Sequence, residues 1–109
     1  MILRIWRGQT TIGNADSYFR HLTGTVLPGL TGIRGFLGRI VLRRPAAGRI
    51  EFLVVTRWES VRAIREFAGE QVETAVVQPG ARALLADYDE FVRHYELVYS
   101  SRGETEALG

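Results

Sequence analysis

Residues 50–58 read Ile-Glu-Phe-Leu-Val-Val-Thr-Arg-Trp, and this stretch decides the fold. A β-strand points successive side chains to opposite faces of its sheet. One face of this strand would carry Ile50, Phe52, Val54, Thr56 and Trp58. The opposite face still offers Leu53 and Val55, so the strand is apolar on both sides. A sheet built around it therefore needs a cover on each face.

The sequence on either side predicts further strands separated by helices. β-Branched and aromatic residues predict strands over Ile2–Arg7, Phe36–Arg43 and Phe91–Tyr99, the first of them ending at Gly8. Residues 44–48 contain proline and glycine, which suit the turn of a hairpin between residues 43 and 50.

Three helices are expected from their capping residues. Asn14 opens the first, whose spacing gathers one apolar side from Ala15, Tyr18, Phe19, Leu22 and Val26 before Pro28 ends it. Ser60 caps a second helix that stops at Gly69. Pro79 opens a short third helix that continues through Leu84 and Leu85.

This order predicts an α+β domain of the ferredoxin-like type, βαββαβ, with a four-stranded antiparallel sheet and its helices on one face. The helices suffice for one face only. We therefore expect a second copy of the chain to cover the other face, giving a homodimer. Residues 1–99 should form the domain, and the polar residues 100–109 a flexible tail.

Composition excludes several classes of function. A chain of 109 residues without cysteine has no thiolate metal site and no cysteine nucleophile, and its two histidines lack the spacing of a metal centre. The fourteen basic residues are all arginine and stand against twelve acids, so a nucleic-acid partner is not expected. No apolar run is long enough to span a membrane and no export signal is visible, which predicts a soluble cytoplasmic protein.

Two segments resemble the antibiotic biosynthesis monooxygenase family. One is Glu51–Ser60, a strand that ends in Trp-Glu-Ser before an amphipathic helix. The other is Val26–Leu30 followed by Ile33–Phe36, where the family places a helix end and a glycine-aromatic entry to the next strand. The order and spacing agree over nearly the whole chain up to Tyr99.

The resemblance implies a dimeric α/β barrel with a cleft between helices and sheet. Some members of the family oxidise aromatic polyketides with molecular oxygen and no metal or flavin, some degrade haem, and several have no established activity. Trp58 matches the tryptophan that lines the family's cleft. The haem-degrading branch places an asparagine on its first strand and a histidine about ten residues past the tryptophan, where this chain has Trp6-Arg7 and Ala68-Gly69. The resemblance therefore implies no haem and no other cofactor.

A cofactor-free oxygenation of a small aromatic or polyketide-like substrate needs a base, an oxyanion donor and aromatic walls. His94 is the candidate base, Trp58 and Trp6 are the candidate walls, and Tyr95 or Tyr18 is the candidate donor. The face that Tyr95 takes depends on a strand register that the sequence does not fix.

Each candidate has a structural alternative. His94 can pair with Glu51 or Glu96, and the large aromatic residues can belong to the core. Arginines within strands must meet a carboxylate or an anionic ligand if they are buried, and this applies to Arg4, Arg7, Arg57 and Arg93. His21 is expected in solvent. The functional alternative is a ligand-binding, cyclase or isomerase-type protein on the same scaffold.

Overall fold

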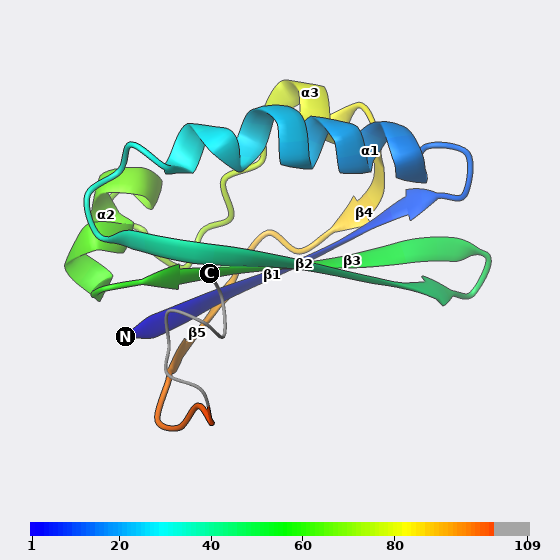
Figure 1. Ribbon diagram of the computed structural model, residues 1–109. Coiled ribbons are helices and arrows are strands. Elements are labelled where there is room, and N and C mark those ends of the chain that lie inside the picture. The colour runs from blue at the N-terminus through cyan, green and yellow to red at the C-terminus, as the bar shows by residue number, and fades with distance from the viewer. Residues whose placement is uncertain (102–109) are drawn as a thin grey trace.

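The computed structural model describes residues 1–101, and Figure 1 shows its helices on one side of an antiparallel sheet. The strands are β1 (Ile2–Thr11), β2 (Phe36–Ala46), β3 (Arg49–Trp58), β4 (Leu85–Tyr88) and β5 (Arg93–Glu96). The helices are α1 (Ala15–His21), α2 (Val61–Ala68) and α3 (Pro79–Arg82). The strand order is β2-β3-β1-β4, and β5 also pairs with β1. This confirms the α+β, ferredoxin-like fold.

The sheet has five strands, not the four that were predicted, because the last strand is split. Between β4 and β5 the chain leaves β1 and pairs with residues 73–75: Ala75 N–H donates to Glu90 O at 2.8 Å, and Val92 N–H donates to Glu73 O at 2.7 Å. The strand predicted over Phe91–Tyr99 is therefore only Arg93–Glu96. Leu85, predicted to be helical, begins β4.

The strands of the hairpin and β1 are longer than predicted. β1 continues past Gly8, which pairs with Phe52, and ends at Thr11. β2 continues to Ala46, so the turn consists of Ala47 and Gly48 alone, both at positive φ (52° and 78°). A two-residue turn with this backbone follows the natural twist of a hairpin.

The long helical segment changes geometry along its length. Asn14 occupies the N-cap position of α1, as predicted, although its side chain makes no capping hydrogen bond. From Leu22 to Val26 the chain forms a π-helical turn, and Pro28–Leu30 is a 3₁₀ turn. Phe19, predicted to be buried, is 40% exposed because the buried side of α1 is centred on Ala15 and Tyr18. Its ring lies under the Arg43 guanidinium.

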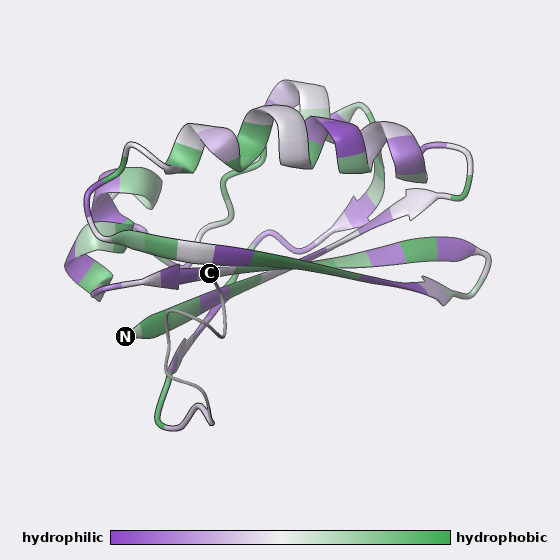
Figure 2. Cartoon of the chain, viewed as in Figure 1, coloured by the Kyte–Doolittle hydropathy of each residue, from purple (hydrophilic) through white to green (hydrophobic). Residues whose placement is uncertain are grey.

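The core lies between the helices and the sheet face that carries the even-numbered residues of β3. Phe52 and Trp58 are fully buried there, the first against α1 and the second against α2. Figure 2 shows hydrophobic residues interspersed with hydrophilic ones along the strands and the helices, as expected for amphipathic elements. Among residues 1–101 no helix is long and apolar enough to cross a membrane. The tail predicted over residues 100–109 lies, from residue 102 onward, outside the described residues.

Gly35 fixes the junction at which β2 begins beside α2. Its φ is +90°, and a Cβ placed there would lie 2.5 Å from the Cβ of Ala63 in α2. Its carbonyl accepts a 2.8 Å hydrogen bond from Glu59 N–H, just before the Ser60 cap of α2. Only glycine meets both requirements without displacing the helix.

We expect Gly35→Ala to lower the free energy of unfolding by about 1–3 kcal/mol, since the new methyl group adds backbone strain and a clash with Ala63. Denaturant unfolding measures the change. Gly13→Ala is the control, because Gly13 has open space around its Cβ position and no positive φ. Equal stability of the two variants would contradict this account of the junction.

Candidate functional site

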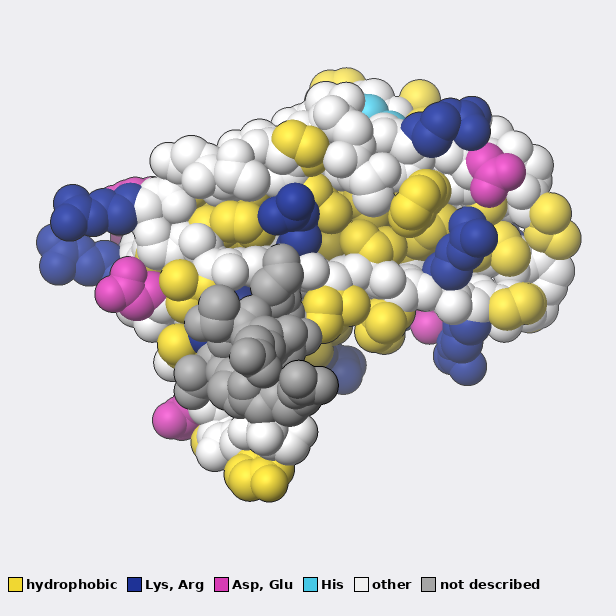
Figure 3. Space-filling view, in the orientation of Figure 1, with side chains coloured by type: hydrophobic (Ala, Val, Ile, Leu, Met, Phe, Trp, Pro, Cys, Tyr) yellow, Lys and Arg dark blue, Asp and Glu magenta, His cyan; other side chains and the backbone are white. Residues whose placement is uncertain are grey.

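A cavity of about 210 Å³ lies between the helical layer and the sheet. Its walls are mostly aliphatic and come mainly from the segment between Tyr18 and Ile33, the strands β1 and β3, and residues 76–81, with Phe67 of α2 and Val92 completing them. Exposed residues among them, such as Thr25 and Val76, mark its opening. Figure 3 shows hydrophobic side chains gathered between the helices and the sheet. Such a cavity favours a small, largely apolar ligand.

Arg4 places a charge in this apolar cavity. It lies on β1 with 4% of its surface exposed, and among residues 1–101 it is the only charged one that lines the cavity. Its Nη1 donates to Val72 O and to His94 Nε2 at 3.1 Å, and its Nη2 donates to Thr74 O at 2.9 Å. The guanidinium is therefore held in place by the loop that precedes α3.

No carboxylate of residues 1–101 forms an ion pair with Arg4. Burial lowers the pKa of its guanidinium to about 10, and the charge of Glu73 opposes that shift only in part. The guanidinium also lies 5.5 Å from the ring centroid of Phe67. Arg4 remains a cation at neutral pH, and its charge is compensated by carbonyls and a ring face instead of an anion.

Tyr18 supplies a buried phenolic hydroxyl to the cavity. It is 2% exposed, and its ring packs edge-on against Phe52 at 4.9 Å between centroids. Burial raises its pKa, so the phenol stays protonated and can donate a hydrogen bond. Its hydroxyl makes no hydrogen bond with the described residues.

Trp6 forms the wall between Arg4 and Tyr18. A Cβ at Gly8 would lie 2.3 Å from the Trp6 ring, so only glycine lets the indole lie along the strand. The indole Nε1 donates to Asp89 O at 3.0 Å. The ring is thus fixed from both sides, and its centroid lies 6.4 Å from that of Tyr18.

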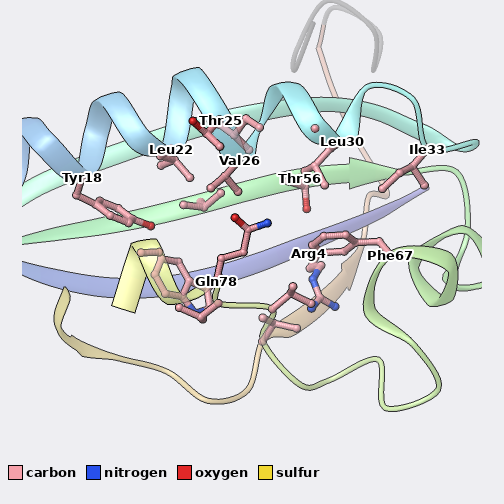
Figure 4. A pocket seen from close by; sticks show the side chains of 18 residues that line it. Arg4, Tyr18, Leu22, Thr25, Val26, Leu30, Ile33, Thr56, Phe67 and Gln78 are labelled. Atoms are coloured by element: carbon pink, nitrogen blue, oxygen red, sulfur yellow. The ribbon is translucent and has the colours of Figure 1, made fainter. Parts of the chain in front are cut away.

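Figure 4 shows how the polar groups are arranged. Tyr18 lies at one end of the pocket with its hydroxyl directed inward, Arg4 lies at the other end beneath Phe67, and the Gln78 amide projects between them. Gln78 is exposed and is the residue before α3, so its backbone is tied to the start of that helix. The site is an apolar chamber with a cation at one end and a neutral donor at the other.

The structure places two of the five predicted site residues, Trp6 and Tyr18, in the cavity wall. Trp58 is not among the lining residues: it is fully buried, stacked on Phe67 at 5.6 Å, and donates from Nε1 to Thr56 Oγ1 at 2.8 Å. Tyr95 is 50% exposed and pairs with Leu3 on the sheet face without helices.

His94 lies behind Arg4 and does not line the cavity. Because arginine can only donate, the 3.1 Å contact makes His94 Nε2 the acceptor and puts the ring proton on Nδ1. Burial first, and the Arg4 charge second, lower the pKa of His94 below 6.5. The glutamates predicted as its structural partners do not pair with it among the described residues; its partner is Arg4.

The other strand arginines have different surroundings. Arg7 pairs with Glu51 at 3.1 Å, and the hydrogen bonds from Arg44 and Arg7 lower the pKa of Glu51. Arg57 is 1% exposed and donates from Nε to the Met1 sulfur. His21, predicted in solvent, is half-buried beside Gly80, because α3 packs on that side of α1.

Sequence reasoning missed Phe67 and the loop residues that complete the cavity. In the sequence Phe67 is one of several apolar residues between Ser60 and Gly69, with no mark of a role in a site, and residues 69–78 show no periodicity. Gln78 had one signal, its place directly before the helix-opening Pro79. Among residues 1–101 no group of three or more histidine, aspartate or glutamate side chains could hold a metal ion.

Neither the protein-family models nor the curated proteins contain a match to this sequence. Solved structures do match. A Deinococcus radiodurans protein provisionally named an antibiotic biosynthesis monooxygenase has a TM-score of 0.63 at 16% identity, over 95% of this chain and 99% of that one. A Bacillus cereus protein of the same provisional name has a TM-score of 0.63 at 18% identity, over 94% and 96%.

The haem degrader MhuD from Mycobacterium tuberculosis, solved with two haems in its active site, has a TM-score of 0.59 at 20% identity, over 92% of this chain and 98% of that one. At these identities the likeness concerns the fold, and it extends over nearly the full length of each protein. The chain therefore has the fold of the antibiotic biosynthesis monooxygenase structures, as its sequence resemblance predicted.

Proposed function

We propose that this protein is a cofactor-independent monooxygenase of a small, oxidisable aromatic compound that binds as an oxyanion against Arg4. The observation that carries the proposal is a buried guanidinium without a carboxylate partner in an apolar cavity. Such a group stabilises negative charge strongly, because little water competes with it. The likeness in fold to antibiotic biosynthesis monooxygenases supports the reaction class.

The chemistry follows from an ionised substrate. Loss of a proton from an activated C–H or hydroxyl group gives a carbanion or phenolate, and the positive charge of Arg4, which holds the substrate's anionic group, and the Tyr18 donor favour that ionisation. The anion's electron pair reduces O₂, and the carbon takes up oxygen as a hydroperoxide. Loss of water from the hydroperoxide leaves a carbonyl, so that one oxygen atom enters the product and the other leaves as water. Tyr18 is proposed to donate to a second oxygen of the substrate.

His94 is proposed to act through Arg4. Its Nε2 is occupied by the Arg4 hydrogen bond, so it orients the guanidinium and is a positioning residue. Trp6 is proposed as the aromatic wall, and Trp58 supports Phe67 from behind. Tyr95 has no role in this proposal, because it is on the opposite face of the sheet.

Haem does not fit this cavity. A tetrapyrrole is much larger than a space of about 210 Å³ can accept. Haem iron is ligated by histidine, cysteine, methionine or tyrosine, and Tyr18 is the one lining residue of these types. Burial raises the pKa of Tyr18, which disfavours the phenolate that would bind the iron. No step of the proposed reaction therefore involves haem.

A ligand-binding protein without chemistry is the second candidate. It is favoured by one observation: no histidine, aspartate, glutamate or lysine lines the cavity, so the described residues offer no ordinary base at the ligand. In the oxygenase proposal, water at the cavity opening takes the proton. Oxygen consumption separates the two candidates.

The working unit is proposed to be a homodimer. The sheet face without helices carries apolar residues from four strands: Leu3 of β1, Leu53 and Val55 of β3, Leu42 of β2 and Tyr95 of β5, the last two each 50% exposed. An open apolar sheet of this kind favours a second copy as its cover.

Oxygen uptake with dihydroxynaphthalene or dihydroxynaphthoate should exceed the buffer rate, and Tyr18→Phe should lower it about ten- to hundredfold by removing one donor. Tyr88→Phe is the matched control, because Tyr88 packs near Trp6 at 6.5 Å without lining the cavity. Uptake no faster than buffer with both compounds would refute the oxygenase proposal.

Stability should depend on pH through His94. Its pKa is lowered in the folded protein, so the unfolded chain takes up the proton first as pH falls below about 6.5, and folding is destabilised. Denaturant unfolding at about pH 7 and pH 5 should show a smaller loss of stability for His94→Gln than for the wild type. An identical loss in both proteins would contradict the contact with Arg4.

Sedimentation at micromolar concentration should give a dimer, and Leu42→Asp should shift it to the monomer by burying a charge in the interface. Ile12→Asp should leave the dimer intact, since Ile12 is 66% exposed in the turn after β1. A monomeric wild type would rule out the proposed assembly.

A further inference from the structure

The Arg4 guanidinium has two hydrogen-bond donors left over. Arginine carries five N–H groups. Three of these groups are used: the two N–H groups of Nη1 donate to Val72 O and to His94 Nε2, and one N–H group of Nη2 donates to Thr74 O. The Nε–H and the second Nη2–H have no acceptor among residues 1–101.

These two donors are on neighbouring nitrogens. Nε and Nη2 border the same edge of the planar guanidinium, which is the edge that a carboxylate meets in side-on pairing. A phenolate has one oxygen and would leave one donor unused in a buried site. A carboxylate has two oxygens and would satisfy both.

The rest of the cavity limits what the carboxylate can be attached to. The Phe67 ring lies 5.5 Å from the Arg4 guanidinium, Trp6 also lines the cavity, and most of the other walls are aliphatic. Arg4 and Trp6 are two residues apart on one face of β1, which is roughly 7 Å along a strand. The volume of about 210 Å³ is below the roughly 300 Å³ at which most ligand pockets begin. One or two fused rings fill such a space.

The geometry points to an aromatic carboxylate of one or two rings as the ligand of this cavity, with its carboxylate on the Nε and Nη2 donors of Arg4 and a ring oxygen near Tyr18. Tyr18 donates to a hydroxyl or carbonyl oxygen at the far end, and Gln78 at the opening contacts the ring edge. This assignment of the substrate class rests on the proposed function for its reaction, but the binding it describes is independent of turnover.

The test compares three probes on the wild-type protein by calorimetry: hydroxynaphthoate, its methyl ester and naphthol. The acid should bind at least about tenfold more tightly than the ester or naphthol, because only the acid gains the paired charge. Its affinity should stay constant between about pH 6 and pH 8, since its carboxylate is ionised throughout. Equal affinities for acid and ester would overturn the assignment. So would naphthol binding that strengthens with rising pH and exceeds that of the acid, which would indicate a phenolate site.

Two variants test whether Arg4 is the residue that binds the carboxylate. Arg4→Lys keeps the charge but loses the paired donors, so the preference for acid over ester should fall severalfold. Arg39→Lys is the matched control: Arg39 is in the same cross-strand row as Arg4, both opposite Thr56, but it is exposed and does not line the cavity. An unchanged preference in a folded Arg4→Lys protein would place the carboxylate elsewhere and overturn the assignment. If Arg4→Lys does not fold, the comparison of acid and ester on the wild type still decides.

Oxygen uptake with dihydroxynaphthoate and dihydroxynaphthalene separates this inference from the proposed function. Tight binding of the acids without oxygen uptake would support an aromatic carboxylate as the ligand and refute the proposed oxygenase function. Uptake with dihydroxynaphthalene, together with equal binding of hydroxynaphthoate and its ester, would support the oxygenase and overturn the ligand class.

Discussion

The burial of Arg4 without a carboxylate is the constraint on which the site depends. A cation in an apolar cavity is costly unless other groups compensate it, and here two carbonyls, a histidine and a ring face do so. The carbonyls of Val72 and Thr74 belong to the loop that leads to Gln78. The same side chain therefore holds the loop over the cavity and supplies the cavity's charge.

The split of the last strand makes room for this arrangement. Residues 90–92 leave β1 to pair with residues 73–75, which brings that loop across Arg4, and Val92 lines the cavity. β5 then returns to β1 with His94 opposite Arg4. An uninterrupted strand would keep all its hydrogen bonds on β1 and leave the loop without a partner. The break in the sheet is thus what joins the loop to the site.

Much of the fold could be predicted because its signals are local. The alternation in residues 50–58, the Ser60 cap and the Gly69 stop are each present in the structure. The site depends on contacts between residues that are far apart in sequence, such as Arg4 with Val72 and His94, and no periodicity reveals these. Tyr95 shows the same limit, since its face follows from pairing with Leu3. Trp58 shows a second limit. The family resemblance implied that Trp58 lines the cleft, but in the structure it stacks on Phe67 and does not line the cavity.

The most direct test of the account observes Arg4 itself by NMR. On addition of hydroxynaphthoate, the Nε–H signal of Arg4 should shift strongly downfield, as a donor without an acceptor gains a charged one. The methyl ester should leave that signal nearly unchanged while it perturbs the signals of Trp6. A saturating acid that shifts the signals of the cavity walls and leaves the Arg4 Nε–H signal in place would contradict the account.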